Sequence, residues 1–300
     1  MRRICKEASE FSTQLDKIYD NYERQYKPSI EAIRSKYATP AGELPPDIDS
    51  LLEAHERQYL IDYFLHALNW HFEIGVSSMP NLVPEAPVHS ITEKTTRFLD
   101  YLGLDEAMEQ ALLIVETKRR SSNLPLPKRN RSGSPPRGES FESIIISSLM
   151  GSTELTEEWQ EWLKTLRDYS QSVKNKLGQA PRRVVITNGN WLILFLDPDD
   201  AFSSSSPSQS KIKVYQNWDA VKEKYNEIFK LLAYHEVLGG VPSLSVGEIS
   251  FYLSAERVDR AMFGIRLMYL EEPEFYLDPS GACHFFYKQL CLASRQWRTN

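Results

Sequence analysis

Two carboxylates and one amine occupy positions at which they could act together on a phosphate ester. Asp100 lies in the apolar run RFLDYLGL, and Glu116 and Lys118 stand on either side of Thr117, directly after the run ALLIV. Mg²⁺ prefers oxygen ligands and takes only one or two protein carboxylates, and a nearby ammonium group can stabilise charge on an attacking or leaving oxygen. These residue types therefore favour metal-assisted hydrolysis of phosphodiesters.

The spacing of Glu116 and Lys118 predicts that they share one face of a strand. Side chains alternate along a strand, so residues two apart point the same way and Thr117 points away. The apolar residues before them indicate a strand buried on both faces, which places its terminal Glu and Lys at the rim of a core, where a metal pocket could form. A simple salt bridge at a strand end is the alternative interpretation, because Glu-x-Lys alone is a common pattern.

The segments before these strands have helical periodicity. Apolar residues recur at three- and four-residue intervals over residues 4–37 and again over residues 50–70. The stretch TPAGELPPDID separates the two, because its three prolines and one glycine cannot continue a helix. We expect Asp49 or Ser50 to cap the second helix.

The segments after them alternate between strand and helix patterns. Residues 97–104 and 111–118 predict strands, residues 152–176 a helix, residues 183–197 a strand pair and residues 215–237 a further helix. Residues 201–210 (AFSSSSPSQS) predict a mobile loop, and the last 60 residues mix short strand-like runs with loops.

The pair Asn188-Gly189 is the strongest hairpin signal in the chain, and we interpret it as a tight turn rather than as catalytic residues. Three tryptophans, Trp159 and Trp162 in the expected helix and Trp191 after the turn, are interpreted as packing residues rather than as surfaces on which bases stack.

The segment from Lys118 to Arg137 carries seven basic residues and no acidic one. Its Pro, Ser and Gly content is typical of a solvated flexible loop, and such a loop can also contact phosphates. We therefore expect nucleic-acid contacts from the basic residues nearest to the strand end, which are Arg119, Arg120, Lys128, Arg129 and Arg131.

Composition excludes several classes of protein. The net charge of −6 argues against a protein that coats nucleic acid over its whole surface. No apolar run is long enough for a membrane span or a signal peptide, and Cys5, Cys283 and Cys291 are expected to be unpaired thiols, so we expect a cytoplasmic protein without a membrane partner. The phosphate loop and the GxGxxG motif are both missing, which predicts no nucleotide cofactor, and the six histidines form no metal-binding motif.

The order of these elements resembles the PD-(D/E)XK nucleases, and within them the N-terminal nuclease domain of the restriction subunit of type I restriction enzymes. The resemblance covers residues 50–200 and extends at most to residue 237. It is carried by Glu53 and Arg57 followed by LIDYFLHALNW, by FLDYL with ETK, and by ITNGNWLILF.

This resemblance implies roles for particular residues. Asp100 and Glu116 would bind Mg²⁺, with Mn²⁺ as a substitute, and the carbonyl of Thr117 would be a further ligand. Lys118 would orient or help deprotonate the attacking water. Glu53 would be an auxiliary acid, with Glu56 one turn away as its competitor.

The chain departs from the family pattern at two positions. Leu99 stands where the family has proline, and Thr165 stands where it has the glutamine of a Gln-x-x-x-Tyr pattern ending here at Tyr169. The second departure puts the usual contact of that glutamine with the active site or substrate in doubt.

The resemblance also implies an architecture and a role. We expect an α/β fold with a restriction-endonuclease-like core over residues 46–237, in which a central mixed sheet is flanked by helices. Residues 1–45 would form an N-terminal helical extension and residues 238–300 a C-terminal α+β extension. The expected function is a metal-dependent endonuclease that hydrolyses DNA in prokaryotic restriction or anti-phage defence. The alternative is a catalytically weak nuclease-fold module that binds nucleic acid or a protein partner. Either extension could hold that partner or a second copy of the chain.

Overall fold

The computed structural model describes residues 5–39, 44–72, 80–90, 95–105, 107–120, 122–126, 128, 135–136, 138–152 and 155–239. The chain divides into two compact units, residues 1–242 and residues 243–300. The expected C-terminal extension lies outside the described residues beyond Gly239, as do Cys283 and Cys291.

The described residues form one mixed sheet of six strands in sequence order. The strands are β1 (Leu82–His89), β2 (Thr96–Leu104), β3 (Ala111–Thr117), β4 (Arg183–Thr187), β5 (Leu192–Phe195) and β6 (Ile212–Tyr215). Neighbouring strands are antiparallel except for β3 and β4, which run parallel. A parallel pair needs a long crossover connection, and helices α5 (Phe141–Leu149) and α6 (Glu157–Leu177) supply it.

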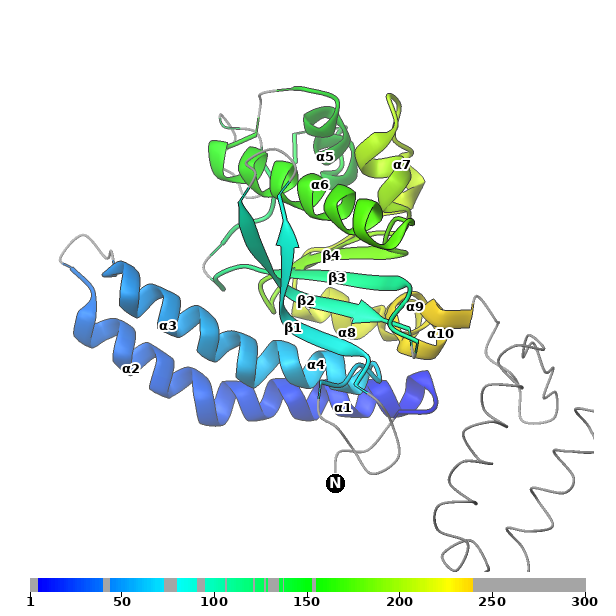
Figure 1. Cartoon of the computed structure of the whole chain (residues 1–300). Helices are drawn as coiled ribbons and strands as arrows, with labels where there is room; N and C mark the ends of the chain where they lie inside the picture. Colours follow the sequence, from blue (N-terminus) through cyan, green and yellow to red (C-terminus); the bar gives the residue numbers. More distant parts are fainter. Residues whose placement is uncertain are drawn as a thin grey trace, which may run out of the picture. The chain divides into compact units, whose positions relative to one another are not determined.

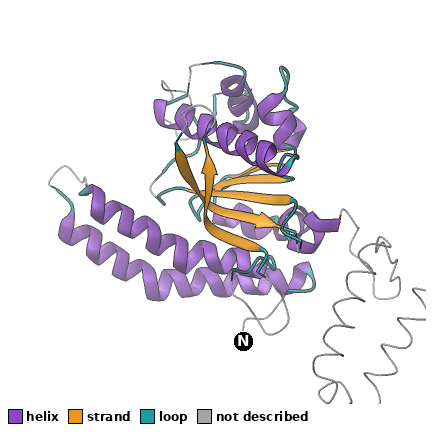
Figure 2. Cartoon of the chain, viewed as in Figure 1, coloured by secondary structure: helices purple, strands orange, loops and turns teal. Residues whose placement is uncertain are grey.

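Helices cover both faces of this sheet (Figures 1 and 2). Helices α5, α6 and α7 (Pro198–Ser203) lie on one side, and the N-terminal helices lie on the other. Two separate apolar clusters result, one on each face, and every residue of β3 is buried between them. The expected α/β class, with a central mixed sheet flanked by helices, is therefore confirmed, and so is the prediction of a strand buried on both faces.

The N-terminal helices form two long rods. The first runs through α1 (Ala8–Asn21), the π-helical turn η1 (Tyr22–Tyr26) and α2 (Lys27–Tyr37). The second runs through α3 (Pro46–Glu56), the π-helical turn η2 (Arg57–Ile61) and α4 (Asp62–Ala67). The rings of Tyr26 and Tyr59 stack with centroids 3.9 Å apart, which joins the two π-helical turns.

The second rod begins earlier than the sequence suggested. We expected a cap at Asp49 or Ser50, but the helix starts at Pro46 with Pro45 as its N-cap residue. Proline suits the first helical position, because its φ is already helical and its missing N–H would have no partner there. The cap prediction was therefore wrong by one turn.

The first rod packs on the sheet unit. Phe11 of α1 contacts Phe64 of α4 and Phe229 of α9 (Tyr225–Leu232), with ring centroids 6.0 and 5.6 Å apart. The described residues of the first rod thus belong to the same compact unit as the sheet.

Residues 197–239 contain more regular structure than expected. The predicted mobile loop 201–210 begins inside α7, whose N-cap Asp197 accepts a hydrogen bond from the Asp200 backbone N–H, and it ends in a short 3-10 turn before β6. We expected one helix over residues 215–237, but the structure has three, α8 (Trp218–Glu223), α9 and α10 (Tyr234–Gly239). Helix α9 ends because the backbone of Ala233 is extended. None of the helices in the described part of the chain is both long and apolar enough to cross a membrane.

Candidate active site

Strand pairing brings Asp100 to the end of β3. The antiparallel register of β2 and β3 ends at the pair Tyr101–Val115, and Asp100 and Glu116 are the next residue along each strand. The Oδ2 atom of Asp100 accepts hydrogen bonds from the backbone N–H and the hydroxyl of Thr117, at 2.6 and 2.7 Å. The sheet itself thus holds Asp100 beside the Glu116-Thr117-Lys118 segment.

Glu116 and Lys118 form an ion pair on one face of β3. The Lys118 Nζ atom lies 2.7 Å from Glu116 Oε1, and both side chains are largely buried. The expectation that these two side chains share a face is confirmed. The parallel strand β4 fixes the backbone here, because Lys118 N–H donates to the Thr187 carbonyl at 2.8 Å.

The surroundings of Glu116 disfavour the charged form of its carboxyl group. Burial raises the pKa of its carboxyl group to about 7, and the negative charges of Asp100 and Glu53 add to this, while Lys118 opposes it. Its second oxygen, Oε2, is buried and has no hydrogen-bond partner among the described residues. A buried carboxylate oxygen without a partner is costly, so this atom is available for a ligand.

Arg57 is a site residue to which sequence reasoning gave no role of its own. Its guanidinium group donates to Asp100 Oδ1 and to Glu85 Oε1, both at 2.9 Å. Arg57 lies in η2, four residues after Glu53, so the same helical rod supplies both residues. The only signal in the sequence was the presence of an arginine in the stretch that carries the resemblance.

The two candidate acids of α3 have different surroundings. Glu53 is half-buried, and its charge raises the pKa of Glu116, which places it within electrostatic reach of the site. Glu56 is buried and accepts a hydrogen bond from the Arg120 backbone N–H at 2.9 Å. Glu56 therefore holds the chain that leaves β3, whereas Glu53 acts on the site through its charge.

Helix α6 forms a wall beside the two carboxylates. The Tyr169 hydroxyl donates to the Phe98 carbonyl at 3.2 Å, and burial together with the charge of Glu116 raises the Tyr169 pKa. Thr165, at the position of the family's glutamine, accepts a hydrogen bond from Arg97 of β2 at 3.1 Å.

The same helix contacts the lysine of the site. The ring of Trp162 lies 5.1 Å from Lys118 Nζ, a cation–π distance. Trp159 and Trp162 both pack in the apolar cluster on this face of the sheet, as expected. Trp162 is only partly buried, and its contact with Lys118 was not predicted.

The basic segment divides into exposed and enclosed charges. Arg119 and Lys128 lie 3.6 and 4.0 Å from Glu158 and Glu157 of α6, in ion pairs with solvent-exposed partners. Arg120 instead packs over the Tyr22 ring at 4.7 Å and pairs with Glu23 at 3.3 Å, with 17% of its side chain exposed. Arg129 and Arg131 lie outside the described residues.

The Asn188-Gly189 turn supports this segment. Asn188 Oδ1 accepts from the backbone N–H groups of Asn190 and Trp191, and its Nδ2 donates to the carbonyls of Arg120 and Ser122. Gly189 has a φ of 76°, which confirms the tight turn. Asn188 thus ties the β4–β5 hairpin to the chain that follows Lys118, which its turn propensity did not reveal.

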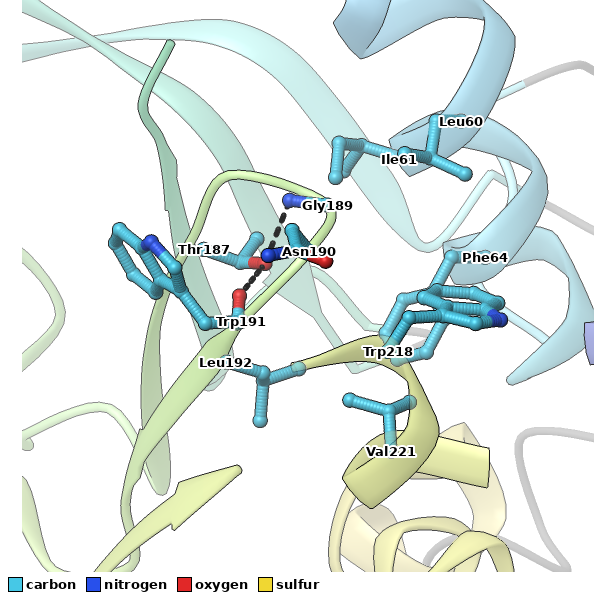
Figure 3. Close-up of a pocket in the computed structure, with 10 residues that line it drawn as sticks. All are labelled: Leu60, Ile61, Phe64, Thr187, Gly189, Asn190, Trp191, Leu192, Trp218 and Val221. Carbon is cyan, nitrogen blue, oxygen red and sulfur yellow. Dashed lines mark hydrogen bonds between the residues drawn. The ribbon is translucent and has the colours of Figure 1, made fainter. Parts of the chain in front are cut away.

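A small pocket lies beside this turn, between it and helices α4 and α8 (Figure 3). The ring of Trp218 and the side chains of Phe64, Leu192 and Val221 line one part of it. Its lining contains no titratable side chain, so it offers neither a metal ligand nor an acid or base.

The fit of a metal ion rests on two carboxylates. Among the described residues, no three His, Cys, Asp or Glu side chains stand together in a way that could hold a metal. Mg²⁺ keeps most of its water ligands and needs only one or two carboxylates, so Asp100 and the unpartnered Oε2 of Glu116 match its requirements.

Comparisons with models of protein families, with curated proteins and with solved structures find no match for this chain.

Proposed function

We propose that the sheet and its helices form a restriction-endonuclease-like core and that the protein is a metal-dependent endonuclease acting on DNA. The observation that supports this most strongly is the meeting of Asp100, Glu116 and Lys118 at the end of β3, with a buried Glu116 oxygen left without a partner. The proposal agrees with the resemblance to PD-(D/E)XK nucleases, and the role in restriction or anti-phage defence rests on that resemblance alone.

The energetics of the site favour a functional interpretation over a structural salt bridge. A buried ion pair often stabilises a protein less than apolar residues of the same size would, and here Glu116 also lies near two further carboxylates. A carboxyl group with so perturbed a pKa, beside a specific cation, is typical of a catalytic or ligand-binding site.

Each residue has a role in this proposal. Asp100, Glu116 and the carbonyl of Thr117 would hold Mg²⁺ or Mn²⁺. When bound, the cation would offset negative charge on the phosphate and lower the pKa of a water molecule. Lys118 holds its ammonium group between Glu116 and α6, where it can stabilise charge on a phosphoryl oxygen. Glu53 adds negative charge that favours a cation.

Cleavage assays with matched variants test this proposal. The purified protein is incubated with plasmid and with single-stranded DNA, with Mg²⁺, Mn²⁺ or EDTA, beside Asp100→Asn and Lys118→Met. The control is Lys174→Met, which removes a lysine in a 2.6 Å ion pair with Asp199 elsewhere on α6. We expect cation-dependent cleavage that falls by about a hundredfold or more in the two site variants and is unchanged in the control. Equal cleavage by the wild type and all three variants would contradict the assignment of Asp100 and Lys118 to the active site.

The contact with DNA is tested through its salt dependence. We propose that Arg119 and Lys128 contact phosphates, with Arg129 and Arg131 of the same segment, whereas Arg120 is engaged with Tyr22 and Glu23. Each lost phosphate contact should lower the slope of log affinity against log salt by about 0.9 for duplex DNA. The variants Arg119→Gln and Lys128→Gln should each show this, and Lys174→Gln should not. An unchanged slope in both would exclude the segment from the interface.

The alternative function, a nuclease-fold module that binds nucleic acid or a protein partner, is favoured by one observation. Thr165 uses its hydroxyl to hold Arg97, so the residue at the family's glutamine position is bound to β2. Salt-dependent DNA binding without cleavage in any cation would support this module over the enzyme.

A further inference from the structure

Both carboxylates at the end of β3 already have a counter-charge from the protein. Lys118 neutralises Glu116, and Arg57 neutralises Asp100. Arg57 lies between Asp100 and Glu85, and three quarters of its side chain is removed from solvent, whereas Glu85 is 67% exposed. In the free protein, arginine and lysine side chains therefore neutralise the two carboxylates.

The hydrogen bonds of Asp100 show where a metal ion would have to enter. A carboxylate has about four lone-pair positions, two on each oxygen. Both positions of Oδ2 accept from Thr117, through its backbone N–H and its hydroxyl. The remaining position lies on Oδ1, and Arg57 holds that same oxygen at 2.9 Å. A divalent cation on Oδ1 would lie beside a guanidinium group, and the two positive charges would repel each other.

Another anion could replace Asp100 as a partner of Arg57. A guanidinium group matches a phosphate as well as a carboxylate, because its donors form a planar fork. Its other partner, Glu85, is largely exposed and so binds it weakly. A phosphate of the substrate is therefore the natural replacement partner at this position.

We propose that Arg57 competes with the divalent cation for Asp100 and moves to a substrate phosphate when DNA binds, so that the cation and DNA bind cooperatively. This inference rests on the proposed function, because it takes Asp100 as a metal ligand and a phosphodiester as the substrate. Arg57 is then both a positioning residue in the free protein and a phosphate contact in the complex. By linkage, DNA strengthens cation binding by the same factor by which the cation strengthens DNA binding.

The test measures Mn²⁺ affinity by electron paramagnetic resonance, with and without a phosphorothioate oligonucleotide that keeps its charge and resists cleavage. Without the oligonucleotide, Arg57→Gln should bind Mn²⁺ about fivefold more tightly than the wild type or better, and the oligonucleotide should no longer improve its affinity. The control Arg97→Gln removes the same charge from β2, where that arginine donates a hydrogen bond to Thr165. Its Mn²⁺ affinity should change by less than about twofold.

A second variant guards against misfolding of Arg57→Gln. Glu85→Gln removes the negative charge of a largely exposed side chain, so Asp100 becomes the stronger of the two partners of Arg57, and Mn²⁺ should bind about twofold more weakly or worse in the free protein. Weaker or unchanged Mn²⁺ binding in Arg57→Gln, or equal tightening in Arg97→Gln, would overturn the competition.

The outcomes separate the two proposals. If the wild type cleaves DNA and binds Mn²⁺ but Arg57→Gln binds it no more tightly, the inference fails and the nuclease assignment stands. If neither the wild type nor any variant binds Mn²⁺, the metal site and the inference fail together.

Discussion

Replacing Glu116 with glutamine should stabilise the cation-free protein at alkaline pH although it removes a proposed metal ligand. Burial raises the pKa of the Glu116 carboxyl group from an ordinary 4.5 to about 7. A carboxyl group with a raised folded-state pKa favours folding below its unfolded pKa, and this contribution is lost as pH rises through the folded pKa. Glutamine resembles the protonated form and never ionises, so the variant avoids that loss.

The size of the effect follows from the two pKa values. Each pH unit between them corresponds to about 1.4 kcal/mol, so ionising Glu116 in the folded protein costs about 3 kcal/mol relative to the unfolded chain. The free energies of unfolding of Glu116→Gln and wild type should differ by about 1 kcal/mol near pH 5 and by about 3 kcal/mol near pH 8.5. The glutamine oxygen can still accept from Lys118, so the packing of the site is kept.

Urea unfolding in EDTA at these two pH values measures the difference. The control is Glu161→Gln, which alters an exposed glutamate of α6 in a 3.6 Å pair with Lys164 and should change stability by less than about 1 kcal/mol at either pH. A difference between Glu116→Gln and wild type that is the same at both pH values would refute the electrostatic description of Glu116.

Three further substitutions test other parts of the structure. Gly103→Ala should lower the free energy of unfolding by about 1–3 kcal/mol, measured in urea, because its new Cβ would lie 2.5 Å from the Trp70 ring. Trp162→Leu should lower kcat about fivefold with little change in KM, because Lys118 loses its cation–π contact, and a change in KM alone would contradict this role. Arg120→Met should destabilise the protein by about 1–3 kcal/mol in thermal or urea unfolding, since it removes the cation packed over the Tyr22 ring and one of the two cations paired with Glu23. An unchanged stability would contradict the enclosure of this charge.

The sequence predicted the parts of the fold that depend on local periodicity. Leu112 to Val115 form an unbroken apolar run, which is typical of a strand covered on both faces, and β3 is buried throughout. The Asn188-Gly189 turn and the long helix α6 were likewise readable from residue types and spacing. In contrast, β1 contains Pro84 and Pro87, which hid a strand at the edge of the sheet.

Within the site, the sequence predicted which side chains share a strand face but not which distant ones contact them. The pairing of Glu116 with Lys118 follows from their spacing of two residues. The contact of Arg57 with Asp100 joins residues 43 positions apart and depends on how the α3–α4 rod packs on the sheet. The enclosure of Arg120 by η1 likewise depends on how the first helical rod packs, so a basic residue in a basic run was not recognisable as an interior one.

The most direct test of the central claim is anomalous diffraction from crystals of the protein soaked in Mn²⁺. The account predicts a peak within coordination distance of both Asp100 and Glu116 in the wild type, and its loss in Asp100→Asn. A peak that persists in that variant, or Mn²⁺ bound only at other carboxylates while these two keep their pairs with Arg57 and Lys118, would contradict a metal-dependent active site at the end of β3.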